Sequence, residues 1–114
     1  MNDLTIDALH AALRGLAARQ RVIADNVANI ETPGFLAGRV QFEDRLRDAL
    51  QTGDAASVRP ASLRSVAPTG VNGNNVKMEE ETLANIDTGL RYQLAVEATS
   101  QKFRLLRTAI GGGR

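Results

Sequence analysis

Hydrophobic positions near the N-terminus recur at alternating steps of three and four residues. This spacing places them on one side of a helix, as in a heptad repeat, with one polar interruption at Gln20. With Thr5 as a suitable N-cap, the pattern predicts a long helix over 5–30. The hydrophobic positions are Ile6, Leu9, Leu13, Leu16, Ile23, Val27 and Ile30.

A second long helix is predicted over 77–110. Glutamates near its start and basic residues near its end follow the order that the helix dipole favours. Its hydrophobic positions drift around the helix, because they do not keep a strict heptad. They are Leu83, Ile86, Leu90, Tyr92, Leu94, Val96, Phe103, Leu106 and Ile110. We expect Leu90, Phe103, Leu106 and Ile110 to face the N-terminal helix of the same chain or the inner wall of an assembly.

The segment between the helices, 31–75, is less regular. Alternation over 38–42 predicts a short extended piece, and 43–50 fits a short helix. Residues 52–75 are rich in Gly, Ala, Ser, Pro and Asn, which predicts a flexible loop. The expected fold class is all-α: one domain over 1–114, in which two long antiparallel helices form a coiled-coil-like hairpin. A chain this small cannot cover all the hydrophobic faces of two such helices. Partner protein chains are therefore implied.

A forced turn closes the first helix. Pro33 restricts its own backbone and that of Thr32, while Gly34 can adopt a positive φ, so Thr32–Phe35 reads as a type II turn. Asn26 and Asn29 precede it at positions where helix propensity does not favour asparagine. Their amides either cap the helix end or bind a neighbouring chain. The pattern indicates a docking corner without catalytic chemistry.

Composition argues against several other functions. The 114 residues carry 14 basic and 13 acidic side chains, which gives no basic surface for nucleic acid. Cysteine is absent, His10 is the single histidine, and Glu79 to Glu81 fit helix-start charge better than a metal site. We therefore expect no catalysis, cofactor, metal or small-molecule substrate. No basic region followed by an apolar run begins the chain, so no cleavable export signal is expected.

The turn segment carries a family resemblance. Asn26–Phe35 resembles the Ala-Asn-x-x-Thr-Pro-Gly-Phe/Tyr signature of the flagellar axial proteins, which form the rod, the hook and hook-associated structures. The matching residues are Asn26, Ala28, Asn29, Thr32, Pro33, Gly34 and Phe35. Segments 19–26, 38–43, 90–93 and 102–110 are similar to the family's proximal rod proteins. The likeness covers both ends, about two-thirds of the chain.

The resemblance implies a structural subunit whose paired terminal helices pack in a hollow helical assembly and transmit torque. Implied helix-packing residues are Leu9, Leu13, Leu16, Ile23, Val27, Leu90, Tyr92, Phe103, Leu106 and Ile110. Implied partners are further copies, other rod proteins, the membrane-embedded ring with its rod-ring adaptor proteins, and the flagellar type III export apparatus. The implied location is the basal body, outside the cytoplasmic membrane. A soluble helical-hairpin adaptor or export chaperone with one client remains the alternative.

Overall fold

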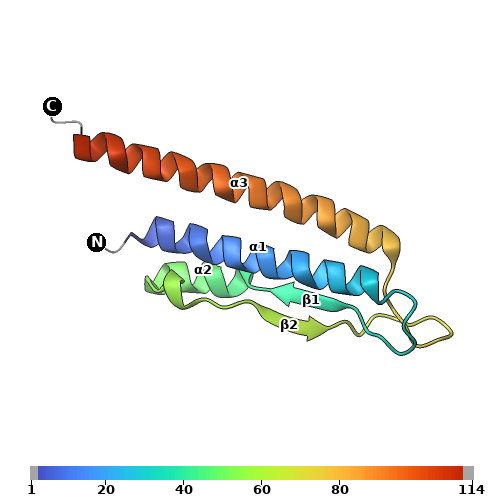
Figure 1. Cartoon of the computed structure of the whole chain (residues 1–114). Coiled ribbons are helices and arrows are strands. Elements are labelled where there is room, and N and C mark those ends of the chain that lie inside the picture. The colour runs from blue at the N-terminus through green and yellow to red at the C-terminus, as the bar shows by residue number, and fades with distance from the viewer. Residues whose placement is uncertain (1–2, 112–114) are drawn as a thin grey trace.

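The computed structural model describes residues 3–111, in which two long helices lie side by side and antiparallel (Figure 1). Helix α1 spans Leu4–Ala28 and helix α3 spans Met78–Gly111. The helix start differs slightly from expectation: Asp3, not Thr5, is the N-cap, and its carboxylate accepts the backbone N–H groups of Thr5 and Ile6. Asp3 fits the role because its oxygen can reach both unpaired amides of the first turn.

The segment between the helices is more ordered than predicted. It contains strand β1 (Gly38–Gln41), helix α2 (Glu43–Thr52), a 3₁₀ helix η1 (Ala55–Ser57) and strand β2 (Ala61–Arg64). The strands pair antiparallel, with Gly38 opposite Arg64 and Gln41 opposite Ala61. The chain is thus mostly helical, with a small antiparallel strand pair where one extended piece was expected, and 52–75 is not simply a flexible loop. Pairing with β1 supplies hydrogen-bond partners for the backbone of β2. The short and exposed sequence of β2 did not indicate this strand.

The molecule is a thin plate. Its extents are 68 × 26 × 14 Å, and α1 lies between α3 on one side and the β1–β2 pair with α2 on the other (Figure 1). One small core joins these elements and consists of Leu16, Val40, Phe42 and Ala95. Gly15 permits it, because a Cβ there would lie 2.3 Å from the Phe42 ring. None of the helices within residues 3–111 combines the length and hydropathy that a membrane crossing requires.

Helix α3 turns small and polar side chains toward α1. Its buried positions are Glu81, Thr88 and Ala95. The larger hydrophobic residues Leu83, Ile86, Leu90 and Leu94 are 55–70% exposed; we call these four the outer stripe. Phe103 and Ile110 are also exposed, so of the two expected alternatives the structure does not show Leu90, Phe103 and Ile110 packed on α1 of the same chain, and their packing in an assembly stays a prediction. The hydrophobic pattern marks a face suited to burial, but it does not say which chain buries it.

Candidate functional site

The predicted type II turn at the end of α1 is confirmed. Gly34 has φ 75°, and the Phe35 N–H donates to the Thr32 carbonyl oxygen at 3.2 Å. The Asn29 amide caps the helix end: it donates to the Asp25 carbonyl at 2.8 Å, and its oxygen accepts the Thr32 hydroxyl at 3.0 Å. We call residues 26–35 the signature corner. Its side chains hold the turn together from within the chain.

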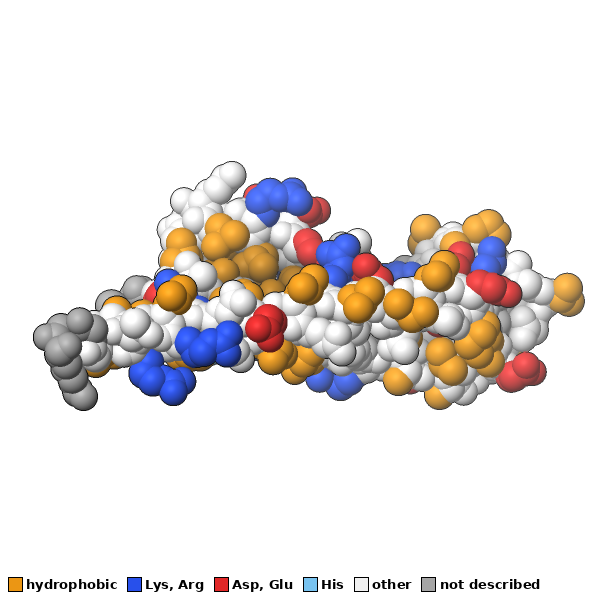
Figure 2. Space-filling model, turned by 90° about the horizontal axis from the view of Figure 1, so that it is seen from above, with side chains coloured by type: hydrophobic (Ala, Val, Ile, Leu, Met, Phe, Trp, Pro, Cys, Tyr) orange, Lys and Arg blue, Asp and Glu red, His pale blue; other side chains and the backbone are white. Residues whose placement is uncertain are grey.

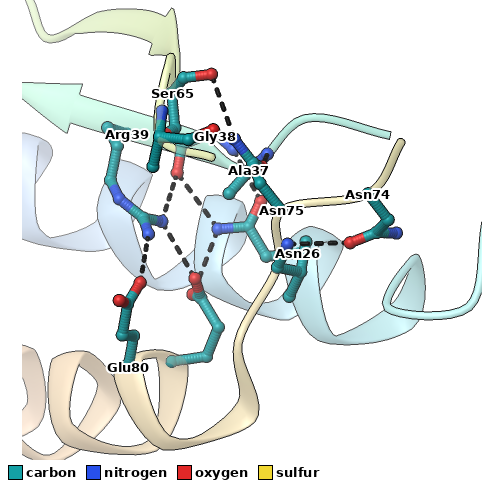
Figure 3. A network of polar contacts seen from close by, with 11 residues as sticks. Asn26, Ala37, Gly38, Arg39, Ser65, Asn74, Asn75 and Glu80 are labelled. Atoms are coloured by element: carbon teal, nitrogen blue, oxygen red, sulfur yellow. Dashed lines mark hydrogen bonds and ion pairs between the residues drawn. The ribbon is translucent and has the colours of Figure 1, made fainter. Parts of the chain in front are cut away.

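Asn26 connects the signature corner to β1. Its side chain is fully buried, and its amide binds both polar groups of Gly38: the Gly38 N–H donates to Oδ1 at 2.7 Å, and Nδ2 donates to the Gly38 oxygen at 3.0 Å (Figure 3). The amide thus replaces the partner that a neighbouring strand would supply. Gly38 allows the close approach, since a Cβ would lie 2.7 Å from a Val22 methyl carbon.

Asn26 also reaches α3. Its Nδ2 donates to Oε2 of Glu81 at 3.1 Å, and Arg39 Nη1 donates to Oε1 of the same carboxylate at 2.9 Å. The Glu81 side chain is 0% exposed, whereas that of Arg39 is 40% exposed and also contacts Glu80 (Figure 3). A buried carboxylate is costly unless it is paired and hydrogen-bonded. Here both conditions are met by residues from two different elements.

Two asparagines before α3 complete this polar network. Asn74 donates to the carbonyl oxygens of Asn29 and Thr32, both at 2.8 Å. Asn75 accepts the Ala37 N–H at 2.7 Å and donates to the Ser65 oxygen (Figure 3). Asn74, Asn75 and Glu81 were not among the site residues expected from the sequence. The two adjacent asparagines after Asn72-Gly73 were the available signal in the sequence, because such residues bind backbone groups in turns.

A separate ion pair ties the start of α2 to α1. Arg19 contacts both oxygens of Glu43 at 2.7 Å, and its guanidinium lies 5.0 Å from the centre of the Phe42 ring. The hydrogen bonds from Arg19 hold the pKa of Glu43 below its ordinary value of 4.5, against a smaller opposing effect of burial. The contact is structural, since it covers the edge of the small core.

Grooves run along both sides of the contact between α1 and α3. One, of about 480 Å³, is bordered by Arg19, Arg39 and Arg91. Each of these arginines contacts an acidic side chain, so no uncompensated cation faces the groove. The other, of about 440 Å³, is lined mainly by Ile23, Val27 and small or polar residues. No group of three or more His, Asp or Glu side chains within residues 3–111 could hold a metal ion.

The remaining predicted site residues differ in how far they are buried within the chain. Leu16 and Ile23 are buried and Leu9, Leu13, Tyr92 and Leu106 are half-buried, whereas Val27 is 37% exposed. In the signature corner, Ala28, Thr32, Pro33 and Gly34 are exposed, and Phe35 is half-buried under Arg64. The outer stripe lies apart from this corner, on the side of α3 away from α1, where hydrophobic side chains are spread along the molecule (Figure 2). Packing of any of these residues against another subunit stays a prediction.

Comparison with known proteins identifies the family. A family model described as "Flagella basal body rod protein" matches residues 6–35, which include the signature corner. The chain is 33% identical to the flagellar basal body rod protein FlgB of Bacillus subtilis, covering 96% of this chain and 95% of that protein. It is 30% identical to FlgB of Escherichia coli, covering 95% and 99%.

The similarity extends to a second kind of rod protein over a shorter region. The flagellar basal-body rod protein FlgG of Caulobacter vibrioides is 40% identical over 76 residues, which is 63% of this chain and 28% of that protein. The match over nearly the full length of both chains is thus with FlgB. This chain therefore belongs to the FlgB family of flagellar basal body rod proteins, and it is a structural subunit of the rod and not an enzyme.

Proposed function

We propose that this subunit lies at the cell-proximal end of the rod. There it contacts further copies, other rod proteins, the membrane-embedded ring and the rod-ring adaptor proteins, and it transmits torque between them. We also propose that it reaches this position through the flagellar type III export apparatus without signal cleavage. These assignments follow from the family resemblance and from the surface described below.

The outer stripe is the observation that carries the assembly proposal. Its four large hydrophobic side chains are more than half exposed on a plate 14 Å thick. A monomer gains nothing from such a row, because hydrophobic surface left in water contributes no burial free energy. A second subunit would cover it. This supports a chain whose final form is an assembly rather than a free monomer.

Exposed hydrophobic residues also lie on a second, different part of the chain, which supports an open helical assembly. The outer stripe lies on α3, whereas the exposed Val66 and Val71 flank the turn region before α3. Contacts between unlike surfaces are heterologous, and heterologous contacts that do not close give filaments or tubes. The adaptor or chaperone alternative requires one client surface only.

The test is to separate export from incorporation. We would compare Leu90→Glu with Gln93→Glu, which introduces the same charge at an exposed position of α3 outside the outer stripe. In cells that depend on the variant, Leu90→Glu should be secreted normally but absent from purified basal bodies, and motility should be lost. Gln93→Glu should incorporate normally. Normal incorporation of Leu90→Glu would refute the role of the outer stripe.

A further inference from the structure

The contact between α1 and α3 consists largely of small side chains. On α3 these are Ala84, Thr88 and Ala95, of which the last two are buried. Small side chains form shallow ridges, so one helix can shift along the other with little change in packing. The Thr88 hydroxyl has no hydrogen-bond partner within residues 3–111 and adds no directional contact. Apolar packing alone therefore defines the axial register of α3 weakly.

Directional contacts are concentrated at one end of this interface. Glu81 accepts hydrogen bonds from Asn26 at 3.1 Å and from Arg39 at 2.9 Å, and its side chain is fully buried. Asn26 cannot follow a moving α3, because its amide is bound to both polar groups of Gly38. A shift of α3 by one turn would take the carboxylate away from both donors and leave a buried charge unpaired.

We propose that Glu81 determines the register of the two long helices: its buried carboxylate, held by Asn26 and Arg39, fixes the axial position of α3 on α1. Single buried polar contacts perform this role in coiled coils, where they specify register at some cost in stability. In the part of the chain that the structure describes, the other polar side-chain contact between these helical segments is Asp3–Lys102 at 3.4 Å. That pair is partly exposed and contributes less, because solvent screens it.

Fixed register matters for the whole subunit, because it sets how far the outer stripe lies from the signature corner. A slip of one turn would move every residue of the outer stripe by about 5 Å relative to α1. Subunits with different registers would then present different surfaces to the same neighbour. The inference concerns the chain itself, and it holds or fails independently of what the outer stripe binds.

Electron–electron distance measurements on spin-labelled protein test this proposal. The chain contains no cysteine, so labels can be attached uniquely at Arg21→Cys and Gln101→Cys, two exposed positions. If Lys102 is level with Asp3, the labels are separated by roughly 17 residues of rise, or about 25 Å along the axes. We expect one narrow distance in the otherwise unchanged chain. Glu81→Leu should add distances shifted by about 5 Å, one helical turn.

Glu79→Leu is the matched control, because it removes the same charge from an exposed position two residues away and should leave the distance unchanged. Glu81→Gln keeps the size but not the charge, and we expect a smaller shifted population than in Glu81→Leu. If Glu81→Leu loses its helical circular dichroism signal, the variant is unfolded and Glu81→Gln becomes the deciding variant. The criterion is again whether a shifted distance appears between the two labels. A single unshifted distance in the deciding variant, or several registers in the chain with Glu81 intact, would overturn the proposal.

Discussion

The two sides of α3 meet their surroundings in opposite ways. Toward α1, near the start of the helix, the buried carboxylate of Glu81 is hydrogen-bonded within the chain. On the opposite side, the outer stripe is hydrophobic and exposed. The first side is packed within the chain, whereas in our proposal another subunit covers the second. Substitutions in the first should therefore act on folding, and substitutions in the second should act on assembly.

The largest effect is expected for Asn26→Leu. This change keeps the side-chain volume but leaves the Gly38 N–H and part of the Glu81 carboxylate without partners inside the protein. The free energy of unfolding should fall by about 3 kcal/mol or more, because unsatisfied buried polar groups are costly. Chemical denaturation of the purified chain measures the loss. Asn85→Leu makes the same change at an exposed site of α3 and should have little effect. Equal losses of unfolding free energy in both variants would mean that the buried hydrogen bonds of Asn26 add no particular stability.

Gly34→Val should have the next largest effect. Gly34 is exposed and a Cβ there would meet nothing within 4 Å, so a steric argument predicts no effect. Its φ of 75° nevertheless disfavours a β-branched residue, and we expect a loss of roughly 1–3 kcal/mol in unfolding free energy. Pro33→Ala should be milder, because it mainly loosens the unfolded chain. A Gly34→Val chain that unfolds and assembles like the unchanged chain would contradict the turn assignment.

Leu94→Ala should alter folding little, because its side chain is 70% exposed. Exposed substitutions away from special features usually change the free energy of unfolding by less than about 0.5 kcal/mol. Incorporation into the rod, measured on purified basal bodies, should nevertheless decrease. If Leu94→Ala substantially lowered the unfolding free energy but incorporated normally, the outer stripe would contribute to folding and not to assembly.

The smallest effect concerns Glu43. Its pKa is lower in the folded chain, so the Arg19–Glu43 pair stabilises the protein above about pH 4.5 and loses this contribution as pH falls through the folded pKa. Because Glu43 is 42% exposed, solvent screening keeps the contribution small. Glu43→Gln should make the unfolding midpoint slightly less dependent on pH in this acidic range. An unchanged pH dependence would mean that the pair adds no measurable stability.

The two long helices were predictable from the sequence because their evidence is local. Hydrophobic spacing placed them within a few residues of Leu4–Ala28 and Met78–Gly111, and alternation indicated β1. The Thr32–Phe35 turn followed from Pro33 and Gly34 alone. Strand β2 was missed because its four residues show little burial and their partners lie twenty or more positions earlier. Pairing at that distance leaves no local pattern.

The polar network was harder to foresee for a related reason. Glu81 has the same sequence surroundings as Glu79 and Glu80, yet it alone of the three is buried. Its burial depends on which side of α3 meets α1, and the hydrophobic spacing of α3 indicated a different side. Once Asn26 and Gly38 are placed, Glu81 acquires its environment. That information exists only in the tertiary structure.

The 14 Å thickness of the molecule has a mechanical consequence. A plate bends more easily across its thin dimension than within its plane, so a single copy can follow the curvature of a tube through a slight bow of α1 and α3. Bonding between neighbours around a closed circumference would remove that freedom, because bending would then stretch or compress adjacent copies. Rigidity would be a collective property of the assembled wall, and an individual copy need not possess it.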